Sequence, residues 1–207
     1  MWRGSTTGQS SSGQNLESLM KSGRVLLAIN QKNCDYSDIK VSRLVQVDSS
    51  QIKFAEKMLR EQGIFGDLID SGEFANYKYF PDVDGNVRAW GSIQKFLLGC
   101  LVFRPYPSKR KIFSDLFLHP YECFVPVKKD FSDLSEKIIW AENNREEAAF
   151  IAYQGFVNAW QYIHSLDKYF AAFILNPVNG MQLISKNRGF ESSILSLRNL
   201  LSIDSFN

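Results

Sequence analysis

Short strand-like runs alternate with stretches of helical periodicity through most of this chain, and no other feature of the sequence restricts the fold as much. The expected strands are short and rich in β-branched or aromatic residues, and they cover residues 38–47, 77–83, 100–104 and 123–127. The expected helices have apolar residues at helical spacing, and they cover residues 16–29 with a break near Gly23, 49–63, 88–99, 109–119, 132–144 and 145–166. Ser132 is the expected cap of the helix over 132–144. This alternation predicts an α/β fold with a parallel sheet and flanking helices.

The length allows one substantial core, or one lobe of a larger enzyme, because the chain has 207 residues of which 44% are hydrophobic. We expect one lobe over residues 1–165 and a helical extension over residues 166–207 that packs on it. The formal net charge of +2, with both signs mixed along the chain, gives no reason to expect nucleic acid as a partner, and it is compatible with a small anionic ligand. No apolar run has the length of an integral membrane segment, and the first residues lack the pattern of a secretory signal.

Cysteine and histidine chemistry is not expected to carry the function. Cys34, Cys100 and Cys123 lie far apart and form no C-x-x-C pair, which is typical of free, mostly buried thiols in a reducing compartment. His119 and His164 have no carboxylate or cysteine neighbour at ligand spacing, so structural roles are expected for both.

The segment "RGSTTG" follows a very short strand at the start of the chain and opens a loop rich in Gly, Ser and Thr. Its amides and hydroxyls are suited to a phosphate, with Arg3 as a charged partner. It lacks the spacing and the lysine of a Walker loop, so an ordinary polar loop is an equal alternative.

The stretch "YKYFPDVDGNVRAWGSIQK", residues 77–95, has two interpretations. A calcium loop is excluded by spacing, because Gly85 falls between Asp84 and Asn86, and Ile93 stands where the bidentate glutamate belongs. The other interpretation is a strand, a tight turn and a helix start that offers free amide donors to a ligand. Trp90 at that helix start fits a ligand site and core packing equally well.

Four motifs in order and spacing resemble glycosyltransferase family 90, over residues 2–160. They are "WRGSTTG", "YKYFPDVDGN" followed by "AW" and a helix, "LLGCLVF", and "FVPVKKDFSDLSEKIIWAENNREEAAFIAYQG". The family includes bacterial lipopolysaccharide-modifying glycosyltransferases and eukaryotic protein O-glucosyltransferases. The resemblance implies a GT-B fold of two Rossmann-like lobes, and this chain corresponds to the C-terminal, donor-binding lobe.

The resemblance also implies a donor site. The residues that match the family's motifs are Arg3, Gly4 and Ser5 with Thr6 beside them, Arg24 at the diphosphate, Asp38 at a strand start, Lys78, Asp84 and Gly85 in the "YKY" and "DG" motifs, and Trp90, Gly91, Ser92 and Lys95 at the helix start that faces the diphosphate. No cofactor is implied, and no metal, since helix dipoles and basic side chains commonly replace a metal at the diphosphate in GT-B enzymes.

The implied reaction is transfer with inversion of glucose, a related hexose or xylose from a UDP-sugar to a hydroxyl of a glycan, a lipopolysaccharide or a protein. Protein O-glucosyltransferases carry an arginine near the position of Gly91 and Ser92, and its replacement here favours a glycan or lipopolysaccharide acceptor. In the family, the "RGS" motif follows an N-terminal lobe that carries the acceptor site and the aspartate taken as general base.

We therefore expect a truncated product or one half of a split enzyme, located in the cytoplasm or at a membrane surface, or in an endomembrane lumen if the chain is eukaryotic and truncated. One alternative is a non-catalytic binding or scaffold relic of the same fold. Another is an unrelated Rossmann-like transferase.

Overall fold

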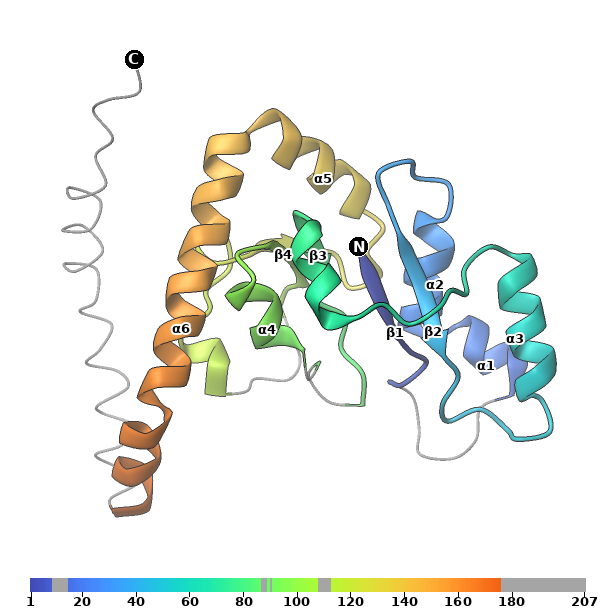
Figure 1. Cartoon of the computed structure of the whole chain (residues 1–207), viewed down its shortest axis with the longest axis horizontal. Helices are drawn as coiled ribbons and strands as arrows, with labels where there is room; N and C mark the ends of the chain where they lie inside the picture. Colours follow the sequence, from blue (N-terminus) through green and yellow to red (C-terminus); the bar gives the residue numbers. More distant parts are fainter. Residues whose placement is uncertain (9–14, 87–88, 90, 108–112, 176–207) are drawn as a thin grey trace. The chain divides into compact units, whose positions relative to one another are not determined.

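The structure, a computed structural model, describes residues 1–8, 15–86, 89, 91–107 and 113–175 and has the predicted mixed α/β architecture (Figure 1). Its strands are β1 (Trp2–Ser5), β2 (Ile39–Arg43), β3 (Tyr79–Pro81), β4 (Leu101–Pro105) and β5 (Val125–Val127). Its α-helices are α1 (Leu16–Met20), α2 (Gly23–Gln31), α3 (Ile52–Glu61), α4 (Ser92–Leu97), α5 (Leu134–Asn143) and α6 (Arg145–Leu175), and two 3₁₀ helices are η1 (Ser71–Asn76) and η2 (Phe113–Leu116).

The described strands pair in parallel, as predicted, but they form two sheets and not one. β1 pairs with β2, and β3, β4 and β5 pair in that order. The two sheets meet at the amino ends of β1 and β3, where the Met1 nitrogen donates to the Tyr79 carbonyl at 2.7 Å. The spatial order is therefore β2-β1-β3-β4-β5. The direction of the chain across the sheet reverses between β1 and β3, and such a reversal is where ligands bind in open α/β sheets.

Arg24 of α2 links the carboxyl end of β1 to the loop that follows β3. Its guanidinium donates to the carbonyls of Ser5 at 2.9 Å, Val83 at 3.1 Å and Asp84 at 3.1 Å. Arg24 thus bonds to one carbonyl of β1 and to two carbonyls that follow β3. Direct pairing of β1 with β3 would instead need the two strands to lie about 4.8 Å apart. Beyond their amino ends, β1 and β3 are therefore linked through the Arg24 side chain and not through main-chain hydrogen bonds between the strands.

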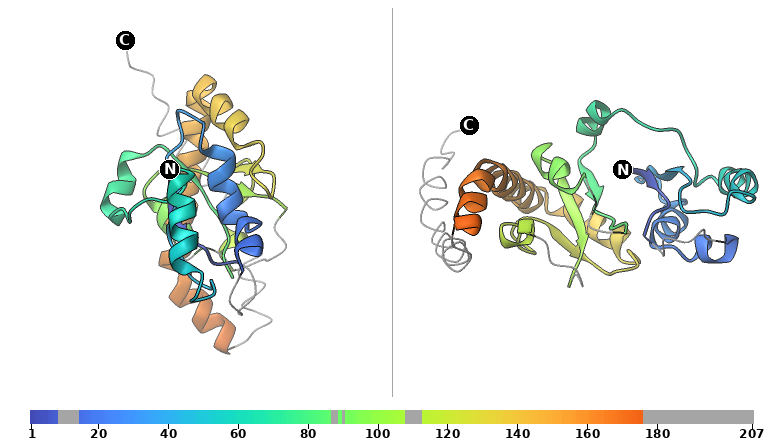
Figure 2. Two further views of the ribbon diagram at one scale, coloured as in Figure 1. Left: turned by 90° about the vertical axis from the view of Figure 1, so that its right-hand side faces the viewer. Right: turned by 90° about the horizontal axis from the view of Figure 1, so that it is seen from below.

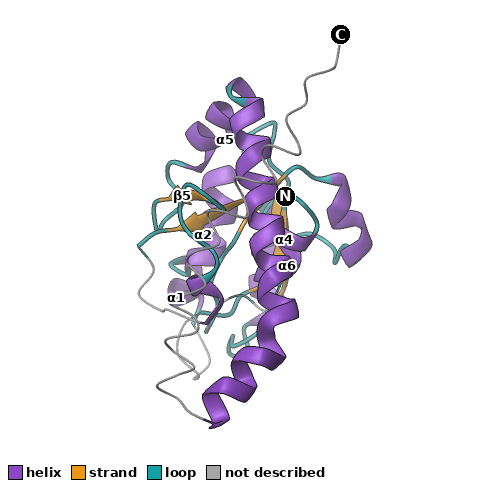
Figure 3. Ribbon diagram, turned by 90° about the vertical axis from the view of Figure 1, so that its left-hand side faces the viewer, coloured by secondary structure: helices purple, strands orange, loops and turns teal. Residues whose placement is uncertain are grey.

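Helices flank the strands on both sides (Figure 3). Helices α1 to α3 lie around the first sheet, and α4, α5 and the first part of α6 lie around the second (Figures 1 and 2). The predicted break near Gly23 is confirmed, since α1 ends at Met20 and α2 begins at Gly23. The main core combines side chains from both sheets, among them Val41 and Phe103, which are fully buried.

Local predictions differ from the structure at two places, and η1 is an element that was not predicted from the sequence. The N-cap of α5 is Asp133 and not Ser132, and the Asp133 carboxylate accepts from the Lys128 amide at 2.8 Å. The helix expected over 109–119 is described only as the 3₁₀ helix η2, since residues 108–112 lie outside the described part. The connection before β3 contains η1, whose start is fixed by the Asp70 carboxylate accepting from the Gly72 amide.

The chain divides into two compact units, residues 1–160 and residues 161–207. Residues 176–207 of the predicted helical extension lie outside the described residues, and the boundary at 165/166 stays a prediction. No helix in the described part is long and apolar enough to span a membrane. All three cysteines are free, and burial raises the pKa of the Cys123 thiol to about 11.

Candidate functional site

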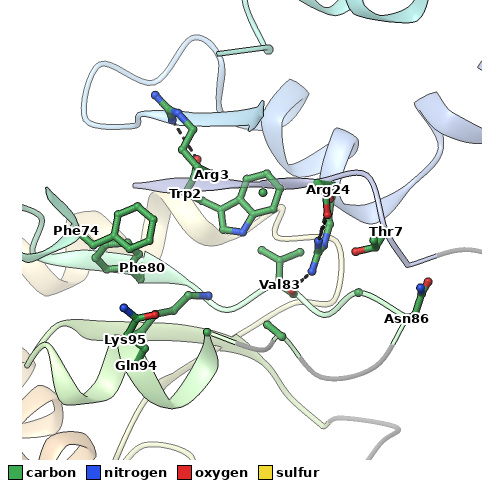
Figure 4. A pocket seen from close by; sticks show the side chains of 15 residues that line it. Trp2, Arg3, Thr7, Arg24, Phe74, Phe80, Val83, Asn86, Gln94 and Lys95 are labelled. Atoms are coloured by element: carbon green, nitrogen blue, oxygen red, sulfur yellow. Dashed lines mark hydrogen bonds between the residues drawn. The ribbon is translucent and has the colours of Figure 1, made fainter. Parts of the chain in front are cut away.

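A cavity of about 320 Å³ lies between the carboxyl ends of β1 and β3, at the reversal in strand order (Figure 4). Four parts of the chain contribute to it: the β1 segment, α2, η1, and the stretch from β3 to α4. The lining residues are Trp2, Arg3, Gly4, Ser5, Thr7, Arg24, Phe74, Phe80, Val83, Gly85, Asn86, Ala89, Gly91, Gln94 and Lys95. None of these described lining residues is a carboxylate.

Lys95 places a positively charged side chain at this cavity, and hydrogen bonds hold it in position. Its ammonium donates to the Asp82 carboxylate at 3.0 Å and to the Pro81 carbonyl at 3.1 Å. A lysine ammonium has three N–H donors, so these two bonds leave one donor for a ligand. Only 11% of the Lys95 side chain is exposed, which fixes the position of the charge.

Asp82, which holds Lys95, is the centre of a buried polar network. Ser92 donates to its carboxylate at 2.7 Å and Arg104 at 3.0 Å, and Arg104 also donates to the Ser92 hydroxyl at 2.6 Å. Burial by itself raises the pKa of Asp82, but Lys95, Arg104 and the Ser92 hydrogen bond outweigh it and hold that pKa well below its ordinary value. Asp82 is therefore ionised, and it anchors α4 and Lys95 beside the cavity.

Arg24 brings two loops together at the other end of the cavity. Besides its bonds to the Ser5, Val83 and Asp84 carbonyls, it lies close to Gly85, where a Cβ atom would stand 2.9 Å from its Nη2 and 2.6 Å from the Thr7 hydroxyl oxygen. Gly85 is required for this close approach. Burial lowers the pKa of Arg24 from its ordinary value, and nearby Asp84 and Asp82 offset part of that effect.

Arg3 contributes to the cavity differently from what the sequence suggests. Its guanidinium forms two bonds to the Asp38 carboxylate, at 2.7 and 2.8 Å, and its side chain is 9% exposed. Figure 4 shows this guanidinium on the far side of β1 from Lys95. The Arg3–Asp38 pair therefore fixes β1 against the start of β2, and the charge of Arg3 is already balanced.

The structure brings together seven of the residues predicted from the sequence, namely Arg3, Gly4, Ser5, Arg24, Gly85, Gly91 and Lys95. Five others lie outside the cavity lining: Thr6, Asp38, Lys78, Asp84 and Ser92. Trp90 is outside the described residues.

Two of these five, Thr6 and Lys78, make contacts that explain their positions. The Thr6 hydroxyl is buried and bonds to both the amide and the carbonyl of Val45, at 2.9 and 2.8 Å. Lys78 lies next to the amino end of β3, away from the cavity, and donates to Glu142 at 3.2 Å. Beside it, burial and a hydrogen bond to Glu142 raise the pKa of Tyr79 to about 12.

Sequence reasoning missed several residues that line the cavity, chiefly Trp2, Thr7, Phe74, Asn86 and Gln94. Trp2, Thr7 and Asn86 lie inside the quoted motifs "WRGSTTG" and "YKYFPDVDGN", but the resemblance assigned no role to them. Gln94 precedes Lys95 and also lies inside the quoted stretch of residues 77–95. Phe74 belongs to no motif and is brought in by η1 alone.

Metal binding has little support in the described part of the chain, where no three His, Cys, Asp or Glu side chains come together as ligands would. The Asp82 oxygens already accept from Ser92, Lys95 and Arg104. The cavity is instead suited to an anion that accepts hydrogen bonds from Lys95 and from main-chain amides.

Comparisons with known proteins show the family of the chain. Residues 16–174 match the profile of glycosyl transferase family 90. Protein O-glucosyltransferase 3 of Homo sapiens is 39% identical over 83 residues, which cover 40% of this chain and 16% of that protein. Protein O-glucosyltransferase 2 of Danio rerio is 35% identical over 101 residues, covering 46% and 19%.

An uncharacterized protein, 179R, of Invertebrate iridescent virus 6 is 37% identical over 86 residues, covering 39% of this chain and 7% of that protein. This chain thus spans less than a fifth of the length of these relatives. Among solved structures, the C-terminal domain of a glycosyl transferase group 1 family protein from Francisella tularensis superposes with a TM-score of 0.44 at 13% identity, covering 77% of this chain and 84% of that one.

Proposed function

The chain belongs to glycosyl transferase family 90, and from this premise we propose that its first cavity binds the diphosphate of a nucleotide-sugar donor, a uridine diphosphate sugar. The observation that carries the proposal is the placement of Lys95, Arg24 and the Gly4–Ser5 main chain around one cavity, whose described lining includes no carboxylate. The cavity also lies at the reversal in strand order, where α/β sheets bind nucleotides.

The proposed chemistry is stabilisation of the leaving group. When the bond between the sugar C1 and the diphosphate oxygen breaks, negative charge grows on the diphosphate. Asp82 and Pro81 already fix the Lys95 ammonium. Its remaining N–H can therefore donate to a diphosphate oxygen as the negative charge grows there, without reorganisation of the side chain. The acceptor hydroxyl attacks C1 from the opposite side, with inversion, and its proton passes to a carboxylate base. That base lies outside the described lining of this cavity, because the lining contains none.

For the acceptor, we propose a hydroxyl of a glycan or lipopolysaccharide. Gly91 lines the cavity, and the resemblance to the family implies an arginine near this position in protein O-glucosyltransferases. A protein hydroxyl is the alternative, supported by the similarity to protein O-glucosyltransferases 2 and 3. The cavity is expected to be the same donor site in either case.

Isothermal titration calorimetry with uridine diphosphate tests the donor site. We expect the wild-type chain to bind it, and Lys95→Met to weaken the binding at least tenfold, because a charge-assisted hydrogen bond is worth about 1.5–3 kcal/mol. Lys78→Met is the matched control, since Lys78 is an exposed lysine outside the cavity and pairs with Glu142. Uridine, which has no phosphate, should bind Lys95→Met and the wild type equally. Absence of heat and of thermal stabilisation at millimolar uridine diphosphate would refute the proposal.

A further inference from the structure

Arg104 of β4 is an arginine buried in an apolar cluster that contains Phe96 and Phe124, and its side chain is 2% exposed. A buried ion pair seldom stabilises a fold more than apolar packing would, and in some proteins such a pair is kept for the geometry that it fixes. We propose that Arg104 is a positioning residue for donor binding, which acts through Asp82 and Lys95 and does not touch the donor. The inference rests on the proposed donor function of the first cavity.

Arg104 is not part of the lining of a cavity. It lines neither the first cavity nor a second one, of about 540 Å³, that lies beside β1 and includes Gln46 in its lining. Asp82 and Ser92 line neither cavity either, and all three residues are at most 3% exposed. Their effect on a bound donor must therefore pass through a residue that does line the cavity, and Lys95 is the lining residue that Asp82 holds.

The two oxygens of the Asp82 carboxylate accept from different donors. Oδ2 accepts from the Ser92 hydroxyl at 2.7 Å and from Arg104 Nε at 3.0 Å, and Oδ1 accepts from the Lys95 ammonium at 3.0 Å. Arg104 Nη2 also donates to the Ser92 hydroxyl oxygen, at 2.6 Å. A guanidinium holds its donors in a rigid planar fork, so Arg104 fixes Ser92 and Asp82 together. Oδ2 is thereby occupied, and Oδ1 is left for Lys95.

The position of Asp82 Oδ1 determines the direction of the free donor of Lys95. The ammonium has three N–H groups in a tetrahedral arrangement, and two of them donate to Oδ1 and to the Pro81 carbonyl. Once these two are fixed, the direction of the third is fixed as well. Arg104 therefore directs that N–H without contacting Lys95. The same contacts give Ser92, which the sequence placed at the donor site, a role one step removed from the donor.

Arg104 is itself held from several sides, as a positioning residue must be. Its Nη1 donates to Asp115 of η2 at 3.3 Å. Its Cζ atom lies 5.3 Å from the ring centroid of Phe96 in α4 and 5.0 Å from that of Phe124, the residue before β5. Aromatic faces attract a cation that is kept from water. A lysine at position 104 would keep the charge but lose the planar fork and the stacking, so this replacement separates geometry from charge.

Calorimetric titration of the full chain with uridine diphosphate and with uridine tests the proposal. Arg104→Lys should weaken binding of uridine diphosphate about fivefold, because a displaced ammonium keeps only part of a charge-assisted hydrogen bond, and should leave uridine binding unchanged. Ser92→Ala keeps every charge and removes one donor to Asp82, so it should act in the same direction. Ser92→Ala decides the question if Arg104→Lys does not fold.

Arg60→Lys is the matched control. Arg60 of α3 also pairs with a carboxylate, that of Glu56, and also lies over an aromatic ring, that of Phe65. It lines neither cavity. Arg60→Lys should therefore bind both probes as the wild type does.

A double variant shows whether Arg104 acts through Lys95. In a Lys95→Met background, Arg104→Lys should change the affinity for uridine diphosphate by less than about twofold, because the ammonium that Arg104 positions is gone. A residue with a merely structural role would instead weaken binding by the same factor in both backgrounds.

Three results would overturn the positioning role and leave the proposed function in place. In the first, Arg104→Lys and Ser92→Ala bind uridine diphosphate as the wild type does. In the second, the effects of Arg104→Lys and Lys95→Met multiply in the double variant. In the third, Arg104→Lys weakens uridine as much as uridine diphosphate. A wild type that binds no uridine diphosphate would overturn both proposals.

Discussion

Gly85 shows how one small side chain determines the shape of the first cavity. It lies where the loop after β1 meets the loop after β3, between the Thr7 hydroxyl and the Arg24 guanidinium. Its φ is not among the left-handed values, so the reason for glycine here is space and not backbone conformation. The sequence suggested a tight turn at this glycine, and the structure adds its close approach to Thr7 and Arg24.

Gly85→Ala is expected to destabilise the chain by about 1–3 kcal/mol and to weaken binding of uridine diphosphate, because overpacking forces Arg24 away from carbonyls on both loops. Chemical denaturation and calorimetry measure the two effects. Gly23→Ala is the control, since a Cβ there meets nothing within 4 Å and Gly23 begins a helix. That variant should be neutral or more stable by up to about 1 kcal/mol. If both alanine variants have the same stability and the same affinity for uridine diphosphate, the close approach at Gly85 contributes to neither stability nor binding.

At the scale of elements, the spacing of apolar residues predicted the order of strands and helices. This spacing shows which face of a helix or strand is buried, and that information is local in the sequence. It could not show that the strands divide into two sheets, or that Arg24 bonds to carbonyls about 60 residues further along the chain, because both are long-range features. Nor could it separate neighbours within a motif. Ser5 at the end of β1 lines the cavity, while the next residue, Thr6, is buried and bonds to Val45.

The Asp82 network joins three elements, and its charge balance gives a prediction. Asp82→Asn leaves Lys95 and Arg104 without a buried carboxylate, and loss of one partner from a buried ion pair costs about 3–5 kcal/mol. The pKa of Asp82 is lower in the folded state than in the unfolded one, so its stabilising contribution is present above about pH 4 and is lost as the pH falls through the folded-state pKa. The stability difference between wild type and variant should therefore be full at neutral pH and should shrink in acid.

Urea unfolding measured from neutral pH into acid gives the free energy of unfolding of the wild type and of Asp82→Asn, and it checks the prediction. Glu61→Gln is the control, because the Lys57–Glu61 pair is exposed and 3.8 Å apart, and its loss should cost less than about 1 kcal/mol. A wild type and an Asp82→Asn variant of equal stability at neutral pH would show that the network is not a source of stability.

At the scale of the whole molecule, the site depends on residues that no single motif contains. Phe74 and Gln46 come from segments without recognisable motifs, and they reach the cavities beside β1 only because η1 and the loop after β2 fold toward β1. The recognised motifs supply main chain and a lysine to the cavity at the strand-order reversal, through Gly4–Ser5, Gly85, Gly91 and Lys95. The sequence motifs therefore predicted part of that lining, and the residues that η1 and the loop after β2 contribute became visible only in three dimensions.

The last prediction concerns how much of the chain is needed for folding and donor binding. The described core clusters and both cavities lie within residues 1–160, and Ala159 of α6 is still fully buried. A chain ending at residue 165 should therefore unfold cooperatively and bind uridine diphosphate with the affinity of the full chain. A chain ending at residue 144 is the control, because it lacks the buried α6 residues Ala148, Ile151 and Ala152 and should not fold. Circular dichroism melts and calorimetry distinguish the two, and a non-cooperative melt of the longer chain would show that residues 166–207 are part of the folding unit.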